Sequence, residues 1–152
     1  MKNLIFAFGI VMLFAQCNAE KELLTPTESS TTKEFVKNPE ATHYVVMQLA
    51  PSADIEGKKN NVKQFHTNNN YAKLRVSNIF ISNEKGETPV LVIRRFENFS
   101  KAKGYIENFE KQIATAKGEK LFAFSQENYR KLLRERDLQG YENFYKTINS
   151  GE

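Results

Sequence analysis

The sequence predicts an α+β fold: an antiparallel sheet with helices between its strands and two further helices at the C-terminus. Three observations support this prediction. Thr88–Phe109 (TPVLVIRRFENFSKAKGYIENF) joins a β-branched run directly to an apolar helical stripe and is the clearest strand–helix pair in the chain. His43–Leu49 and Val90–Ile93 are apolar on both alternating faces, which is typical of central strands covered on both sides. Taken together, the segments follow the order β-α-β-β-α-β and then α-α.

The first half of the ordered region predicts a strand, a helix and the start of a hairpin. His43–Leu49 is the first strand, and a weak helix follows over about Asp54–Asn69. Leu74–Ile81 is the second strand, where Asn78 interrupts one apolar face in a way that a β-bulge explains. Asn83–Gly86 then supplies a turn, because glycine adopts positive φ without steric cost, and the third strand pairs back on the second.

The second half predicts a long helix, a short strand and two short helices. Asn98 stands at the N-cap position of the long helix, which is expected to end near Gly118. The apolar stripe of this helix consists of Ala102, Tyr105, Ile106, Phe109 and Ile113. Leu121–Phe124 is the fourth strand, and Ser125 and Asp137 are placed to cap the two helices that close the chain.

The order of the first six elements is the split β-α-β arrangement of ferredoxin-like folds. In that arrangement the first and third strands are central, and these are the two strands that are apolar on both faces. The two inserted helices cover one face of such a sheet. The other face must then be covered by the C-terminal pair of helices or by a partner.

The composition describes one globular domain and excludes several classes of site. The chain has 152 residues, of which 40% are hydrophobic and 26% charged. Its net charge of +4 is small, and acidic residues are interspersed with basic ones, so nucleic acid is not expected as a partner. Cys17 is the only cysteine, so neither an intramolecular disulfide nor a thiolate metal cluster can form.

Met1–Ala19 is expected to be a signal peptide. A basic n-region precedes the apolar run Leu4–Ala15, which has the length of a signal h-region and is too short to span a bilayer. Cleavage before Cys17 would remove a leader of residues 1–16 and leave a thiol for lipid attachment, as in a lipoprotein. Gln16 stands where a small residue is expected, and ordinary cleavage at the alanine two residues before or after Cys17 is the alternative.

Residues 18–40 are expected to form a flexible linker, because they are rich in Glu, Lys, Ser and Thr and lack apolar periodicity. The folded domain is predicted to span residues 42–149, with Phe35 and Val36 docking on its edge. The chain is therefore predicted to be exported, with a lipid anchor to a membrane if Cys17 is acylated.

The sequence contains no motif for catalysis, a cofactor or a metal. P-loop, GxGxxG and GxSxG motifs are all missing. His43 and His66 have no other metal-ligating residue at a suitable spacing, and we interpret His43 as structural or exposed. We therefore expect a protein that is not an enzyme and uses no cofactor.

Arg94 and Arg95 are the most distinctive polar pair. Neighbouring residues of a strand point to opposite faces, so one arginine should lie toward the helices and the other toward the far face. Two interpretations are open. Both side chains reach solvent at the end of the strand, or they bind an anion, a glycan or a protein partner through their bidentate guanidinium groups. Tyr44 is a further candidate contact for a partner or a glycan.

Four segments carry a family resemblance: HYVVMQL, LRVSNIFI, TPVLVIRRFENFSKAKGYI and, most specifically, FAFSQENYRKLLRERDLQGYENFYK. The region His43–Ile148, which contains them, resembles the C-terminal domain of the PorW (SprE) family, periplasmic lipoproteins associated with type IX secretion and gliding motility in Bacteroidetes-type bacteria. The tetratricopeptide repeats that precede this domain in the family have no counterpart in this chain. The resemblance implies a cell-envelope setting, a protein partner and a link to secretion or gliding, and it implies no catalytic residue.

A weaker similarity is to SPOR domains, which bind the glycan strands of peptidoglycan. The shared features are the β-α-β-β-α-β order and the pattern VLVIRRFENFSKA. This alternative predicts an open sheet face with polar and aromatic side chains. A protein-interaction module predicts instead an apolar or aromatic surface that no element of the chain covers.

Overall fold

The structure is a computed structural model that describes residues 34–84, 86–114 and 119–149. The chain divides into two units, residues 1–31 and residues 32–152, and all described residues belong to the second. The predicted signal peptide and the candidate lipid-attachment residue Cys17 lie outside the described residues.

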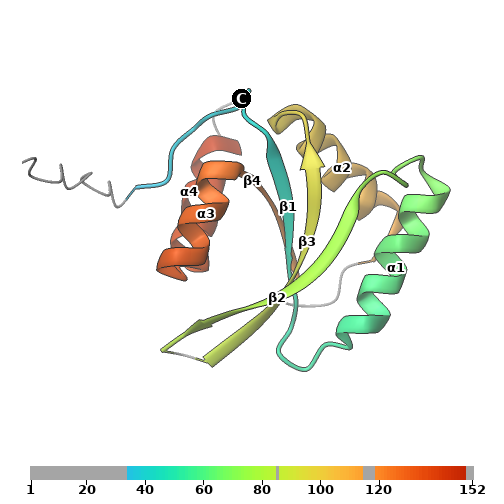
Figure 1. The fold of residues 1–152 in the computed structure, drawn as a ribbon, viewed down its shortest axis with the longest axis horizontal. Coiled ribbons are helices and arrows are strands. Elements are labelled where there is room, and N and C mark those ends of the chain that lie inside the picture. The colour runs from blue at the N-terminus through green and yellow to red at the C-terminus, as the bar shows by residue number, and fades with distance from the viewer. Residues whose placement is uncertain (1–33, 85, 115–118, 150–152) are drawn as a thin grey trace, which may run out of the picture. The chain divides into compact units, whose positions relative to one another are not determined.

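The second unit is an α+β domain with a four-stranded antiparallel sheet, as the sequence predicts (Figure 1). Its elements are β1 (His43–Gln48), α1 (Ile55–Asn68), β2 (Arg75–Asn83), β3 (Gly86–Phe96), α2 (Phe99–Gln112), β4 (Lys120–Ser125), α3 (Gln126–Glu135) and α4 (Leu138–Asn149). The strand order β2-β3-β1-β4 places β1 and β3 in the centre. The fold is thus compatible with a ferredoxin-like β-α-β-β-α-β unit, and the two C-terminal helices follow it.

Helices cover both faces of the sheet (Figure 1). On one face, α1 and α2 bury side chains of alternate strand residues, among them Val45 and Ile93. On the other face, α3 and α4 bury the intervening residues, among them Val46 and Phe124. The alternation of a strand sends successive side chains to opposite faces, so the two-sided apolar pattern of β1 and β3 is explained by two separate cores.

Short polar side chains begin each of the four helices. The acceptors are Asp54, Asn98, Ser125 and Asp137, which lie 3.0, 3.0, 3.2 and 2.7 Å from the backbone nitrogen three residues further on. Each satisfies an N–H group that has no partner inside its helix. The predicted caps at Asn98, Ser125 and Asp137 are therefore confirmed.

The end of α2 differs from the prediction. We expected the helix to continue to Gly118, but it ends at Gln112, and Ile113 has extended backbone dihedrals. Ile113 still packs against the core of the α1–α2 face from this extended position. Ile113 fits the apolar spacing of the helix in the sequence, but its backbone is no longer helical, so the periodicity alone predicted a helix that is too long.

The predicted bulge at Asn78 is wrong. β2 pairs with β3 without interruption from Arg75–Arg94 to Asn83–Gly86. The irregularity lies in β3 instead, because β1 pairs His43 with Phe96 and Tyr44 with Arg94, which leaves Arg95 unmatched. Asn78 needs no bulge, since it lies on an edge strand at the rim of the core, where Lys59 Nζ of α1 is 3.4 Å from its Oδ1 atom.

The ordered contacts begin before the predicted domain start. The backbone of Val36 exchanges two hydrogen bonds with the side chain of Asn128, at 3.1 and 2.8 Å. The ring of Phe35 meets that of Tyr141 edge-on, with centroids 4.9 Å apart. Docking of Phe35 and Val36 is thus confirmed, because an aromatic anchor and two hydrogen bonds fix a segment that is otherwise polar.

Candidate binding surface at the end of the sheet

Four cationic side chains gather where β2 begins and β3 ends. Arg75 and Arg94 are direct cross-strand partners, Lys73 precedes β2, and Arg95 follows Arg94 in β3. These four residues, which we call the basic cluster, alone line an open hollow of about 550 Å³. The structure therefore joins the two predicted arginines to two further cations that are distant from them in sequence.

The basic cluster is not neutralised within the described part of the chain. None of the ion pairs among the described residues involves one of its members. Its one side-chain hydrogen bond within this region runs from Arg94 Nη2 to Ser77 Oγ, at 2.8 Å, and brings no negative charge. Like charges directly opposite each other destabilise a sheet, so the Arg75–Arg94 pair costs stability that an anionic ligand would restore.

Arg94 lies on the face of the sheet that α3 covers. Its charge is close enough to Tyr129 to act on that phenol: burial raises the pKa of Tyr129, and the Arg94 guanidinium opposes this rise. Tyr44 is the cross-strand partner of Arg94 in β1, and its ring packs edge-on against Tyr129 with centroids 5.0 Å apart. Tyr44 is only 5% exposed, so it supports the floor beneath Arg94 and has little surface of its own for a partner.

Arg95 faces a second hollow, beside α2. This hollow measures about 610 Å³ and is shared between the end of β3 and the first turns of α2. Lys101 adds a further cation to its wall, and Glu97 is its one carboxylate. Both Arg94 and Arg95 are exposed and line the hollow of the basic cluster, and Arg95 also borders the hollow beside α2.

Lys73 and Arg75 were missed by sequence reasoning, although a signal was present. Counting outward from the turn residues Asn83 and Gly86, the residue opposite Arg94 is Arg75. This count requires an uninterrupted hairpin. The bulge expected at Asn78 would have shifted the register by one residue and hidden the pair.

The two histidines are structural. His43 is 3% exposed, and its Nδ1 atom lies 2.7 Å from the carbonyl oxygen of Ala41. His66 is 4% exposed, and its Nε2 atom lies 2.9 Å from the hydroxyl of Tyr105. Burial lowers the pKa of both rings. No set of three His, Cys, Asp or Glu residues within the described region is grouped to hold a metal ion.

A third hollow, of about 700 Å³, lies between the β2–β3 hairpin and the turn that joins α3 to α4. Its wall is acidic and contains Glu84, Glu87, Glu135, Asp137 and Glu142, with Arg136 as its cation. The domain is therefore electrically polar along β2. The basic cluster lies at the start of this strand, and carboxylates lie near its end.

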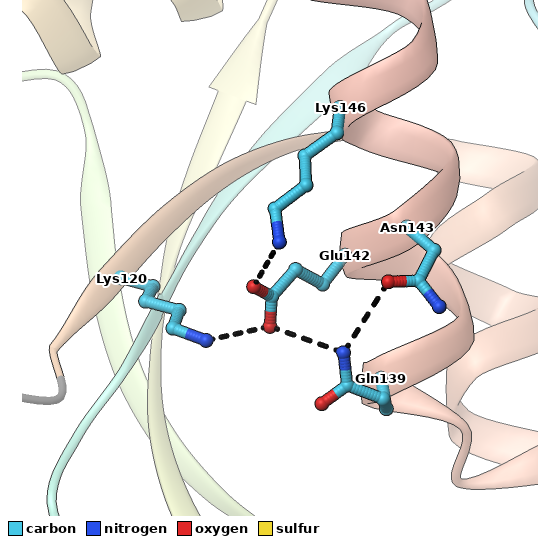
Figure 2. A network of polar contacts seen from close by, with 5 residues as sticks. All are labelled: Lys120, Gln139, Glu142, Asn143 and Lys146. Atoms are coloured by element: carbon cyan, nitrogen blue, oxygen red, sulfur yellow. Dashed lines mark hydrogen bonds and ion pairs between the residues drawn. The ribbon is translucent and has the colours of Figure 1, made fainter.

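Glu142 is engaged in holding α4 to the sheet (Figure 2). Its carboxylate accepts hydrogen bonds from Lys120 Nζ at 2.7 Å and Gln139 Nε2 at 3.5 Å, and Lys146 Nζ lies 2.9 Å away. Hydrogen bonds from Lys120 and Lys146 lower the pKa of Glu142 and keep it ionised. Because each of its two oxygens contacts a lysine, this carboxylate links α4 to β4 and does not act as a proton donor.

Neither of the surfaces that the two alternative functions predict is found in the described residues. An open sheet face, expected of a glycan-binding module, is not available where α3 and α4 cover β1 and β4, since Val46 and Phe124 are fully buried. A broad apolar surface, expected of a protein-interaction module, is also missing from the described residues. The large exposed hydrophobic residues among them are Val36, which precedes β1, Phe80 on β2 and Leu133 on α3.

Comparisons with protein-family models, curated proteins and solved structures found no match for this chain. The resemblance to the PorW family therefore stays a prediction. Within the described residues, every helix is too short or too polar to cross a lipid bilayer.

Proposed function

We propose that this chain is an exported, lipid-anchored and non-enzymatic protein of the cell envelope, whose folded domain binds an acidic protein partner through the basic cluster. The observation that carries this proposal is the gathering of four cations that form no ion pair with a carboxylate of the described residues. Guanidinium groups offer paired donors that fit the two oxygens of a carboxylate, and Lys73 adds a compact charge beside them.

A protein partner fits this surface better than a polynucleotide does. The cluster is confined to one end of the sheet, whereas carboxylates line the hollow at the other end of β2. A long polyanion would meet repulsion along that strand, and a localised acidic patch would not. The resemblance to the PorW family points to the type IX secretion or gliding machinery as the source of this partner.

Lipid attachment at Cys17 would hold the domain at a membrane. The residues between Cys17 and Glu34 would then act as the tether. Replacement Cys17→Ala is expected to move the protein from the membrane fraction to the soluble periplasmic fraction. If the wild type and Cys17→Ala are retained equally in the membrane fraction, the lipid anchor is refuted, and the proposed binding by the basic cluster is unaffected.

The proposed partner can be sought by cross-linking and affinity capture from cells that express the full tagged chain. The informative variant is Arg75→Glu with Arg94→Glu, which reverses two charges of the basic cluster. The matched control is Lys111→Glu with Arg134→Glu, which makes the same charge change at exposed positions on α2 and α3. We expect an acidic envelope protein that the wild type and the control recover and the cluster variant loses. Recovery of the same proteins by all three chains would contradict the proposal.

A further inference from the structure

The two edge strands of the sheet differ in whether another element of the described chain lies against them. β4 forms one edge, and α4 lies against it, with the Tyr141 hydroxyl donating a hydrogen bond to the Ala123 carbonyl at 2.6 Å. β2 forms the other edge and is longer, from Arg75 to Asn83. Residues 76–82 (VSNIFIS) contain no charge, proline or glycine, which are the usual devices that keep an edge from pairing. Its hairpin projects beyond the ends of the helices (Figure 1).

The outward-facing backbone groups of β2 can be identified from Pro89. Its carbonyl accepts a hydrogen bond from the nitrogen of Leu49, on the β1 side, and proline has no N–H to offer to β2. Its cross-strand partner Phe80 therefore belongs to a pair without hydrogen bonds. Because such pairs alternate with bonded ones, the outward groups are those of Val76, Asn78, Phe80 and Ser82.

These outward groups have no backbone partner among the described residues, whose turn and loop hydrogen bonds leave out the span 76–82. The side chain of Phe80 is 47% exposed in the middle of this edge. A sheet edge with unpaired backbone N–H and C=O groups can bind an extended segment as an additional strand, and the exposed Phe80 ring offers a side-chain contact beside it.

We propose that an extended segment of the acidic partner adds to β2 as a fifth, antiparallel strand, with its carboxylates at its C-terminal end beside the basic cluster. This inference rests on the proposed function and specifies how the partner binds. All neighbouring pairs in the sheet are antiparallel, and an antiparallel strand on β2 ends next to Arg75. Glu84 and Glu87 lie near its other end, where they repel acidic residues and favour a neutral or basic start.

The probe for this proposal is a labelled peptide, Lys-Thr-Val-Thr-Val-Thr-Glu-Asp-Glu, titrated with the detergent-solubilised full chain and followed by fluorescence anisotropy. One comparison peptide has the reversed sequence, which moves the acids to the N-terminus. A second is N-methylated throughout its central residues, which removes the strand donors and keeps the charge. We expect both changes to weaken binding at least about tenfold, since each removes several contacts.

The protein offers a matching pair of variants. Asn78→Pro removes an outward N–H that bonds no described backbone group, so the fold should tolerate it while binding is lost. Arg75→Glu with Arg94→Glu should weaken binding through charge alone. If the N-methylated peptide binds as tightly as its parent and the charge variant still abolishes binding, strand addition is overturned and the proposed function stands. If charge reversal leaves binding unchanged, both are overturned.

Two further outcomes also decide against strand addition by a partner. If no peptide binds while the acidic protein is still captured from cells, the partner uses another mode. If sedimentation shows a dimer of the full chain that Asn78→Pro converts to a monomer, a second copy occupies the β2 edge in place of the partner.

Discussion

Replacement of Tyr141 by phenylalanine tests how α4 is held against the sheet. The Tyr141 side chain is 1% exposed, its ring stacks on Phe124, and its hydroxyl donates a hydrogen bond of 2.6 Å to the Ala123 carbonyl. Burial raises the pKa of Tyr141, so the hydroxyl stays protonated as a donor at all ordinary pH values. Tyr141→Phe keeps the ring and removes only the donor. The expected loss is about 1–2 kcal/mol of unfolding free energy, the usual cost of one buried hydrogen bond.

Thermal and urea unfolding followed by circular dichroism measure this loss. For a domain of this size, it corresponds to a fall of about 4–8 °C in Tm. Tyr44→Phe is the matched control, because Tyr44 is also buried but its hydroxyl makes no hydrogen bond with the described residues. We expect the control to change stability by less than about 0.5 kcal/mol. Equal stabilities of the two variants would refute the account of how α4 docks.

Three further predictions concern stability. Glu142→Gln should cost about 1 kcal/mol at neutral pH, because it weakens contacts to two lysines that are themselves exposed. The pKa of Glu142 is lowered in the fold, so this cost should disappear as pH falls below the ordinary value of 4.5. His66 has a lowered pKa, so the unfolded chain takes up its proton first and stability should fall as pH drops through 6.5. His66→Gln should therefore reduce the difference in unfolding free energy between about pH 8 and about pH 5, and an unchanged difference would assign the effect to other groups. Phe35→Ala should cost about 1–2 kcal/mol and speed amide exchange of residues 34–40; unchanged exchange would show that this segment is not held by its ring.

The strands and helix starts could be predicted because their signals are local. Two-sided apolar runs identified β1 and β3 as central, and side chains such as Asn98 and Ser125 cap the helices that follow them. The end of α2 could not be predicted in the same way. Ile113 is apolar because it packs on the core, and periodicity does not distinguish a helical residue from an extended one that reaches the same core.

The candidate site was only half visible in the sequence because it depends on pairing between strands. Arg94 and Arg95 are adjacent and were recognised, whereas Arg75 enters the cluster through the register of the hairpin. The sequence offered Tyr44 as a candidate contact for a partner or a glycan, but in the structure it is buried and packs against Tyr129 of α3. The covering of that face also depended on tertiary packing, since the sequence left open whether the last two helices or a partner would provide it.

The basic cluster is tested most directly by the salt-dependent binding of a labelled glutamate-rich peptide to the full chain, measured by anisotropy. We predict that the wild type and the control variant Lys111→Glu with Arg134→Glu bind alike, and that binding weakens as salt rises. Arg75→Glu with Arg94→Glu should weaken binding at least about tenfold. Equal weakening in the two double variants would show that only net charge matters, and it would contradict the assignment of the basic cluster as the binding surface.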